Sequence, residues 1–403
     1  MGTRFWILYG EAVRTSVGFF WKSGWAFVLG YFISAMIQAF IPKGRLTPYI
    51  GNPRPKSLSL ATLFGTISSS CSFAALATAR SLLLKGAHFV AAVAFMFAST
   101  NLVIELGILI LIFLGWQFLA AEVIGGLLLI AISSILIVFT YPENWLKASR
   151  QKVEKEAEAE EGEFGWRERI KSREGWLLVG HLFVMEWKMV WREILIGFTV
   201  AGFVAVLVPR PFWQSIFLAD IVSNTSGLNF WIVLENSLLA PFVAAATFIG
   251  SMGNIPLATV LNANGVLFAG IMGFIYSDLM VPPLVAVNAK YYGWKTAIYI
   301  TIIMYASVVV TAITLHYTFA VLDVMPTSAR KVEEVAQFKI DYSFWMNIFA
   351  ILVTAALIFS HDRYMKIKKM DKKDTSEGLS LKKIATYLAL LILIGGFSVF
   401  LLN

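Results

Sequence analysis

Long runs of apolar residues recur along this chain of 403 residues, and they constrain its fold more than any other feature. A helix needs roughly 20 such residues to cross a hydrocarbon core of about 30 Å. Because backbone polar groups in lipid must be satisfied within the protein, the runs predict an all-α integral membrane protein that crosses the cell (plasma) membrane many times. About eight runs are candidates for a full crossing: residues 25–41, 88–113, 118–140, 194–208, 266–281, 297–316, 344–359 and 384–402.

The composition agrees with a membrane protein and excludes several functional classes. The chain is 58% hydrophobic and only 14% charged, which is too apolar for a soluble globular domain. We interpret the net charge of +8 through membrane topology and not as a sign of nucleic-acid binding. One cysteine cannot form an internal disulfide or a multi-thiolate metal cage, and the four histidines lack ligand spacing, so no cofactor is expected.

The first 24 residues carry charges among aromatic side chains. Arg4, Glu11, Arg14 and Lys22 interrupt any apolar core, so this stretch does not read as a cleavable signal. We expect residues 1–24 to form an amphipathic N-terminal helix that lies in the membrane interface. If residues 4–22 cross the membrane instead, the N-terminus moves to the inside and the other assignments stand.

Short sequence matches recur in the same order in two halves of the chain. The triplet "LAT" returns after 181 residues. The dipeptide "GW" returns after 178 residues, and the triplet "AST" is followed after 178 residues by the similar triplet "YSD". This pattern predicts two repeats, at residues 25–140 and 191–320. A charged cytoplasmic loop at 141–190 separates them, and residues 321–403 add two transmembrane helices with a basic cytoplasmic loop at 361–383.

Each predicted repeat contains an apolar segment that small polar residues break near its centre. The first, residues 57–85, is broken by "SSSCS", and the second, residues 230–262, by "GSMGNIP". We expect both to be helical hairpins or broken helices that enter the membrane and turn back, the first from the cytoplasm and the second from outside. The repeats would then be inverted, which is the architecture of many secondary transporters.

Two long strings, "SSSCSFAALATARSLLLKGAHF" and "FIGSMGNIPLATVL", resemble the predicted permeases of the YraQ and ArsP type. The resemblance implies a membrane permease, and some members of this family export trivalent organoarsenicals. Those exporters carry a Cys-Ser-Cys-Gly type motif at the first hairpin. Here the motif reads Cys71, Ser72, Phe73 and Ala74, so Cys71 carries over as a tentative metal or metalloid ligand and the second thiol is missing.

Candidate solute-binding residues lie at the two predicted breaks and beside them. At this depth small polar residues either bind a solute or allow close helix packing, and Cys71 is either a soft ligand or a packing residue. The candidates are Ser68, Ser69, Ser70, Cys71 and Ser72 at the first break, Ser251, Gly253 and Asn254 at the second, and Ser99, Thr100, Asn101 and Ser277 beside them.

Two carboxyl groups, those of Asp278 and Glu105, are predicted to lie within the membrane. Because a carboxylate at that depth costs a few kcal/mol, it normally faces the protein interior or a water path. Both are candidates for proton or ion coupling, with a structural hydrogen bond as the alternative.

The first hypothesis for function is a secondary transporter that moves a small solute by alternating access. The solute would be a metalloid or organoarsenical, a metal or a small anion. The alternative is a channel or facilitator with a continuous pore between the hairpins. An enzyme is disfavoured, because the sequence lacks paired catalytic aspartates, a plausible Ser/His pair and a zinc motif. The expected partners are the solute, the bilayer and, by analogy with other transporters, a second copy in a homodimer.

Overall fold

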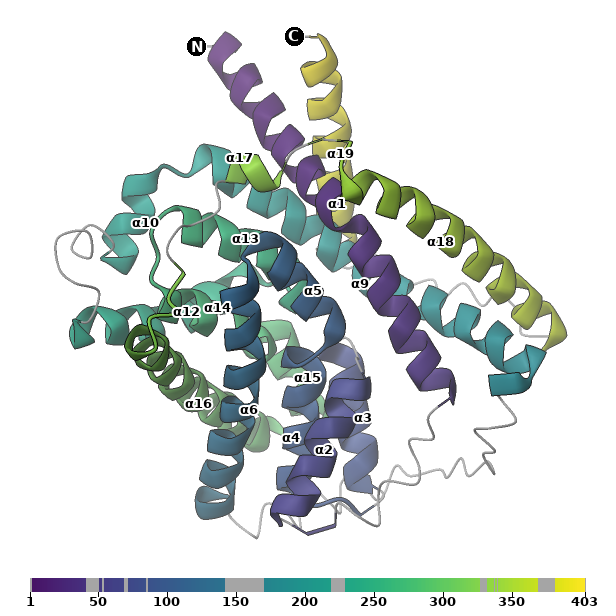
Figure 1. Cartoon of the computed structure of the whole chain (residues 1–403), viewed down its shortest axis with the longest axis vertical. Coiled ribbons are helices and arrows are strands. Elements are labelled where there is room, and N and C mark those ends of the chain that lie inside the picture. Colours follow the sequence, from purple (N-terminus) through teal and green to yellow (C-terminus); the bar gives the residue numbers. More distant parts are fainter. Residues whose placement is uncertain are drawn as a thin grey trace.

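The computed structural model describes residues 2–40, 51–52, 54–68, 72–84, 86–141, 170–218, 229–326, 332–336, 338, 340–368 and 381–402. Within these ranges every regular element is a helix, so the all-α prediction is confirmed (Figure 1). The first half contains α1 (Gly2–Phe40), α2 (Pro55–Ser68), α3 (Ser72–Leu84), α4 (Phe89–Asn101), α5 (Ile104–Phe113) and α6 (Trp116–Thr140). The second half contains α9 (Arg173–Leu207), α10 (Arg210–Phe217), α12 (Phe230–Thr247), α13 (Ser251–Ala263), α14 (Phe268–Ile275), the 3-10 helix η2 (Asp278–Met280), α15 (Pro282–Tyr292) and α16 (Trp294–Val321). After them come α17 (Val332–Val335), α18 (Tyr342–Ile367) and α19 (Leu381–Leu402).

Seven helical segments in the described part of the chain are long and apolar enough to cross a membrane. They are Arg4–Phe40, Phe89–Phe113, Trp116–Thr140, Arg173–Leu207, Phe230–Thr247, Trp294–Val321 and Tyr342–Ile367. A multi-pass membrane protein is therefore confirmed. The predicted crossing at residues 266–281 is wrong, because α14 spans only 8 residues before the chain turns into η2.

The N-terminal region is one continuous helix of 39 residues, without a break at residue 24. At 1.5 Å per residue such a helix is about 58 Å long, well beyond the thickness of a hydrocarbon core. The charge that marked the expected boundary, on Lys22, is neutralised by Asp341, whose Oδ2 lies 2.8 Å from the Lys22 Nζ. Residues 1–24 by themselves do not reveal this partner, because Asp341 is the N-cap residue of α18, far along the chain.

Helix α9 extends far into the predicted loop at 141–190. It begins at Arg173, after Ser172, whose hydroxyl accepts a hydrogen bond from the Gly175 N–H at 3.0 Å. Residues 142–169 of that loop lie outside the described residues. The last part of the expected loop is thus helical, because its apolar residues pack on α1 and α18.

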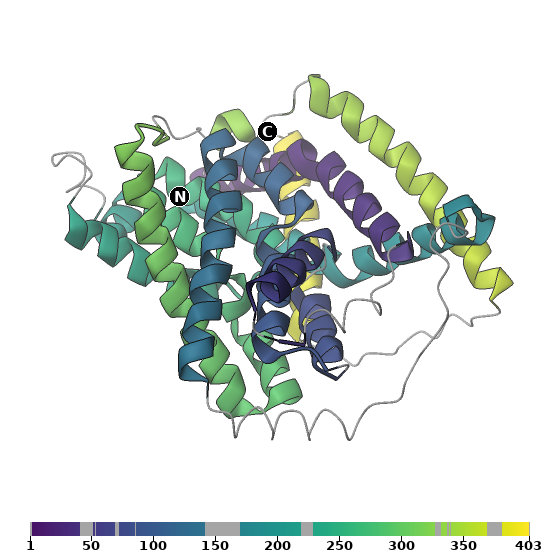
Figure 2. The same cartoon turned by 60° about the horizontal axis from the view of Figure 1, so that its bottom comes forward.

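Two pairs of long helices pack side by side in opposite directions (Figures 1 and 2). In α1 and α9, Ser34 Oγ donates to Glu186 Oε1 at 2.8 Å, while Ser16 Oγ donates to the Thr199 carbonyl at 3.3 Å. In α6 and α16, the hydroxyls of Thr140 and Tyr299 lie 2.7 Å apart, so the end of one helix meets the start of the other.

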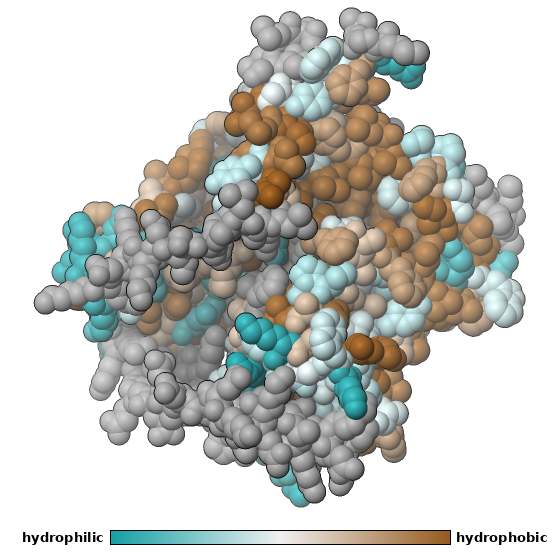
Figure 3. All heavy atoms as spheres, turned by 180° about the vertical axis from the view of Figure 1, so that it is seen from behind, coloured by the Kyte–Doolittle hydropathy of each residue, from teal (hydrophilic) through white to brown (hydrophobic). Residues whose placement is uncertain are grey.

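The centre of the molecule is filled by α4 and α14, in which every residue is buried. The outer face of α6 instead exposes apolar side chains, among them Ile124, Leu127, Ile135 and Val138. Seen from behind, apolar side chains cover a broad area of the upper surface, while polar ones gather at the left edge and lower centre (Figure 3). Such a large exposed apolar surface fits a protein embedded in lipid.

Candidate functional site

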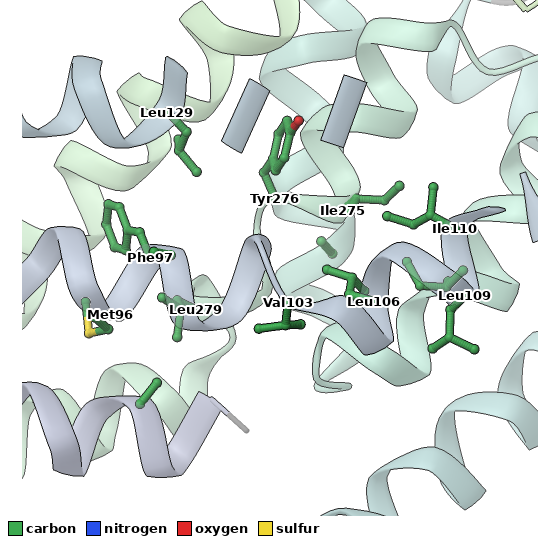
Figure 4. Packing of buried hydrophobic residues seen from close by; sticks show 14 of the residues in the cluster. Met96, Phe97, Val103, Leu106, Leu109, Ile110, Leu129, Ile275, Tyr276 and Leu279 are labelled. Atoms are coloured by element: carbon green, nitrogen blue, oxygen red, sulfur yellow. The ribbon is translucent and has the colours of Figure 1, made fainter. Parts of the chain in front are cut away.

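Four places where one helix ends and the next begins position the candidate site. The first lies between α2 and α3 at residues 69–71, which are outside the described residues. The second separates α12 from α13 at residues 248–250, the third separates α4 from α5 at residues 102–103, and the fourth lies at residues 276–281 around η2. Figure 4 shows Val103 at the third interruption, between the helix of Phe97 and the helix of Leu106. The second and fourth positions differ from the prediction.

The second interruption ends at Gly250, the first residue of the "GSMGNIP" stretch, instead of running through the stretch. Phe248 adopts a left-handed conformation with φ of 55°, and α13 starts at Ser251 with Pro256 inside it. A proline removes one helix hydrogen bond but does not have to end the helix near its start. The expectation that Pro256 breaks the helix is therefore wrong.

Asn254 stabilises this turn. Its Oδ1 accepts a hydrogen bond from Thr247 Oγ1 at 3.2 Å, and its Nδ2 donates to the Ile249 carbonyl at 3.2 Å. Gly253 of α13 packs against α9 at Gly197, whose lack of a side chain allows the approach: a Cβ on Gly197 would lie 2.7 Å from the Gly253 Cα. The structure thus places these two predicted site residues in turn stabilisation and helix packing.

A narrow cavity lies where α1, α9 and the interrupted helices of both halves meet. Its volume is about 20 Å³, which holds about one water molecule. We call it the central cavity, and its lining residues are Tyr31, Ser72, Thr100, Val103, Glu105, Val190, Glu193, Ile194, Ser251 and Met252. Four of the predicted site residues, Ser72, Thr100, Glu105 and Ser251, are therefore brought together from distant parts of the chain.

Asp278 is fully buried beside this cavity. Ser72, the first residue of α3, donates a hydrogen bond from its Oγ to Asp278 Oδ2 at 3.1 Å. The second oxygen, Oδ1, is buried and has no hydrogen-bond partner among the described residues. A polar link between the two halves of the chain thus borders the cavity.

Glu105 enters the cavity from the first turn of α5 and is 1% exposed. Gly30 of α1 makes room for it, since a Cβ on Gly30 would lie 1.8 Å from the Glu105 Cγ. A second carboxyl group, that of Glu193, approaches from α9, and its Oε2 would lie 2.8 Å from a Cβ on Gly250.

Among the polar lining residues, sequence reasoning missed two, Tyr31 and Glu193. Glu193 lies in the predicted second repeat and directly precedes the apolar run that begins at Ile194. An acidic residue at the edge of a predicted crossing was the signal available. Tyr31 gave no signal, because an aromatic residue within a crossing is ordinary.

The remaining candidates lie away from the central cavity or outside the described residues. Ser99 Oγ donates to the Met96 carbonyl at 3.1 Å, and Ser277 Oγ donates to the Gly273 carbonyl at 2.5 Å, so both hydroxyls are used in local hydrogen bonds. Asn101 does not line the cavity, and Ser68 is buried at the end of α2. Ser69, Ser70 and Cys71 lie outside the described residues. In the described part of the chain no group of three or more His, Cys, Asp or Glu side chains could hold a metal ion.

A multi-pass helical protein whose interrupted helices surround a polar cavity has the features of a membrane transport protein. Residues 8–317 match the family described as ArsP_1, predicted permease, and the chain belongs to this family. It is 36% identical over 331 residues to a protein of Mycobacterium tuberculosis (strain ATCC 25618 / H37Rv) named putative permease Rv2963, covering 79% of each chain. No solved structure matches the chain. The family expected from the sequence is confirmed.

Proposed function

We propose that this permease is a secondary transporter that moves a small solute by alternating access through the central cavity. The observation that carries the proposal is the origin of the lining residues: Ser72, Thr100 and Glu105 come from the first half, and Glu193 and Ser251 from the second. A site shared by two halves can open to either side as the halves move against each other. The small volume of the cavity favours this mechanism over a continuous pore.

Helix boundaries support two structural repeats. Four boundaries in the first half recur in the second half after 179 residues: Ser68 and Thr247, Ser72 and Ser251, Leu84 and Ala263, Phe89 and Phe268. Two residues that precede helices recur after 178 residues: Val103 and Val281, and Gly115 and Gly293. Both glycines have a positive φ, of 110° and 89°. Such agreement over separate helix ends and backbone angles argues for one structural unit used twice.

The directions of equivalent helices support an inverted relation between the repeats. α1 and α9 are equivalent by their order, as are α6 and α16, and the helices of each pair are antiparallel (Figure 2). The contact of α3 with α15 is matched by the contact of α13 with α5. A pseudo-two-fold axis in the membrane plane would produce both features.

The chemistry of the cavity favours a neutral or positively charged solute over a small anion. Glu105 and Glu193 line the cavity, and Asp278 borders it through Ser72. Ionised carboxyl groups repel an oxyanion, but they can bind a cation and can take up a proton in its place. Cys71 directly precedes Ser72 in the chain, so its thiol is a candidate soft ligand for a metalloid.

Labelling of Cys71, the only cysteine of the chain, tests alternating access. In oriented vesicles, a membrane-impermeant maleimide is added from one side or the other, with and without an ion gradient. We expect Cys71 to react from each side under different conditions, and Cys71→Ser to abolish all labelling. Reaction from only one side under every condition, or simultaneous equal reaction from both sides, would contradict the mechanism.

A thermal-shift screen tests the solute class. Purified wild type and Cys71→Ser are mixed with a trivalent phenylarsenical, Zn²⁺ or arsenate. Stabilisation of the wild type by the arsenical that is lost in Cys71→Ser would support a thiol ligand. The matched double variant Ser251→Cys/Cys71→Ser should regain this stabilisation only if the second break shares the site. Stabilisation by arsenate alone would refute the assignment to a neutral or cationic solute.

A further inference from the structure

Glu122 of α6 is a buried carboxyl group outside the central cavity. It is 2% exposed, and both of its carboxyl oxygens are buried without a hydrogen-bond partner among the described residues. Because a carboxylate without partners is costly at this depth, the group requires an explanation.

The position of Glu122 links it to two of the helix interruptions. One turn further along α6, Gly125 and Gly126 form a close-packed surface. A Cβ on Gly126 would lie 2.4 Å from Leu102 Cδ2 at the interruption between α4 and α5. A Cβ on Gly125 would lie 2.2 Å from the hydroxyl of Tyr276, which precedes η2. Figure 4 shows Val103 and Tyr276 in the same core as Leu129 of α6.

A crevice of about 290 Å³ between α5 and α6 leads to Glu122. Its polar lining residues are Glu122 and Asn101, whose Oδ1 is also buried without a partner in the described part of the chain. Its outer lining residues, among them Ile104, Leu111 and Val123, are apolar and exposed. The outer rim of the crevice is therefore apolar, as expected of a surface that contacts lipid.

The surroundings distinguish a proton from a metal ion. Ca²⁺ needs 6 to 8 oxygen ligands, and Mg²⁺ needs an octahedral set. Glu122 belongs to no cluster of three or more metal-binding side chains in the described ranges. A proton needs only the carboxyl group itself, and it removes the cost of burying a charge.

We propose that Glu122 is a proton-binding site of this permease, linked by charge to Asp278 at the central cavity. Tyr276, two residues before Asp278, donates a hydrogen bond from its hydroxyl to the carbonyl of Ala121, the neighbour of Glu122, at 2.7 Å, which holds the segment of Asp278 against this part of α6. The titratable groups whose charges act on Glu122 are Asp278 and Tyr276. Two negative charges at this depth repel each other, so the carboxyl groups of Glu122 and Asp278 do not both ionise readily. A cationic solute that stabilises ionised Asp278 would thereby favour a proton on Glu122, and loss of the solute would favour its release to water or to Asp278.

This inference rests on the proposed function, because a proton site acts only in a coupled transporter. The test, however, needs neither solute nor transport. Dicyclohexylcarbodiimide reacts with protonated carboxyl groups in apolar surroundings, and mass spectrometry identifies the labelled residue. We expect labelling of Glu122 near neutral pH, its complete loss in Glu122→Gln, and no change in Glu235→Gln, which removes a carboxyl group from a lipid-facing pocket on α12.

The link to Asp278 is tested by the pH dependence of the same labelling. In Asp278→Asn the repulsion is gone, so labelling of Glu122 should be lost at a lower pH than in the wild type. The melting temperature gives an independent measure: it should fall as the pH rises from about 5 to about 8, and less steeply in Glu122→Gln, because the folded protein holds a proton that the unfolded chain releases.

Absence of Glu122 labelling at every pH, together with identical melting profiles of the wild type and Glu122→Gln, would overturn the proton site. Labelling whose pH dependence is unchanged in Asp278→Asn would overturn the link to Asp278. Glu122 labelling in a protein whose Cys71 reacts from one side only would preserve the proton site and refute alternating access, so the two failures are distinguishable.

Discussion

Gly125 is the position at which a single added methyl group should disturb the candidate site most clearly. A Cβ there would lie 2.2 Å from the Tyr276 Oη and 2.4 Å from Leu315 Cδ1. Leu315 ends in a flexible side chain, but the Tyr276 hydroxyl is held by a hydrogen bond to the Ala121 carbonyl at 2.7 Å. In Gly125→Ala, overpacking should cost about 1 to 3 kcal/mol, and loss of the hydrogen bond about 1 kcal/mol more.

The expected result is a free energy of unfolding lower by about 2 to 4 kcal/mol, measured by chemical denaturation in detergent with tryptophan fluorescence. Gly273→Ala is the matched control. It also lies in a buried helix, but its nearest neighbour, the Ala240 Cβ, would be 3.5 Å away, so alanine should be tolerated or slightly stabilising.

A double-mutant cycle with Tyr276→Phe isolates the cause. In the Tyr276→Phe background the hydroxyl is gone, so Gly125→Ala should lower the free energy of unfolding by less than it does in the wild type, and the difference should be roughly the cost of overpacking. Equal stability of Gly125→Ala and Gly273→Ala, or full additivity with Tyr276→Phe, would refute the proposed packing of α6 against the residue before η2.

Further predictions concern the site and the contact of α1 with α18. Ser72→Ala removes the hydroxyl that donates to Asp278 and should lower the free energy of unfolding by about 1 to 3 kcal/mol, whereas Ser72→Thr should retain most of it. Gly197→Ala should destabilise the protein by about 1 to 3 kcal/mol through overpacking against the Gly253 backbone, measured by the same denaturation, and wild-type stability would contradict the close approach of α13 to α9. Partial burial acts to raise the pKa of Asp341, but hydrogen bonds that include the one from Lys22 lower it to about 2. The stabilisation from this ion pair should be present above about pH 4 and be lost as the pH falls toward about 2; a melting temperature with the same acid profile in Asp341→Asn would contradict it.

The sequence by itself determined the helical membrane class and the family. Apolar runs of sufficient length admit no other structure in lipid, because each backbone polar group needs a partner inside the protein. The small polar residues before Ser72 and the glycines near Ser251 marked the interruptions, since they favour helix ends. Local chemistry was enough for these conclusions.

Predictions from local sequence were wrong where a contact with another part of the structure changed the energetic cost of placing a residue in a helix. Lys22 suggested a helix in the membrane interface, yet Asp341 neutralises it within a continuous α1. Pro256 suggested a break, yet the turn before α13 is stabilised by Asn254, and the proline is accepted inside the helix.

Only the tertiary structure decided which polar residues share a cavity. Asn254 and Ser277 satisfied the same sequence criteria as Ser251 and Thr100, but only Ser251 and Thr100 line the central cavity. Glu122 became a candidate because its carboxyl oxygens have no hydrogen-bond partner in the described part of the folded chain, and a sequence does not specify the partners of a buried group.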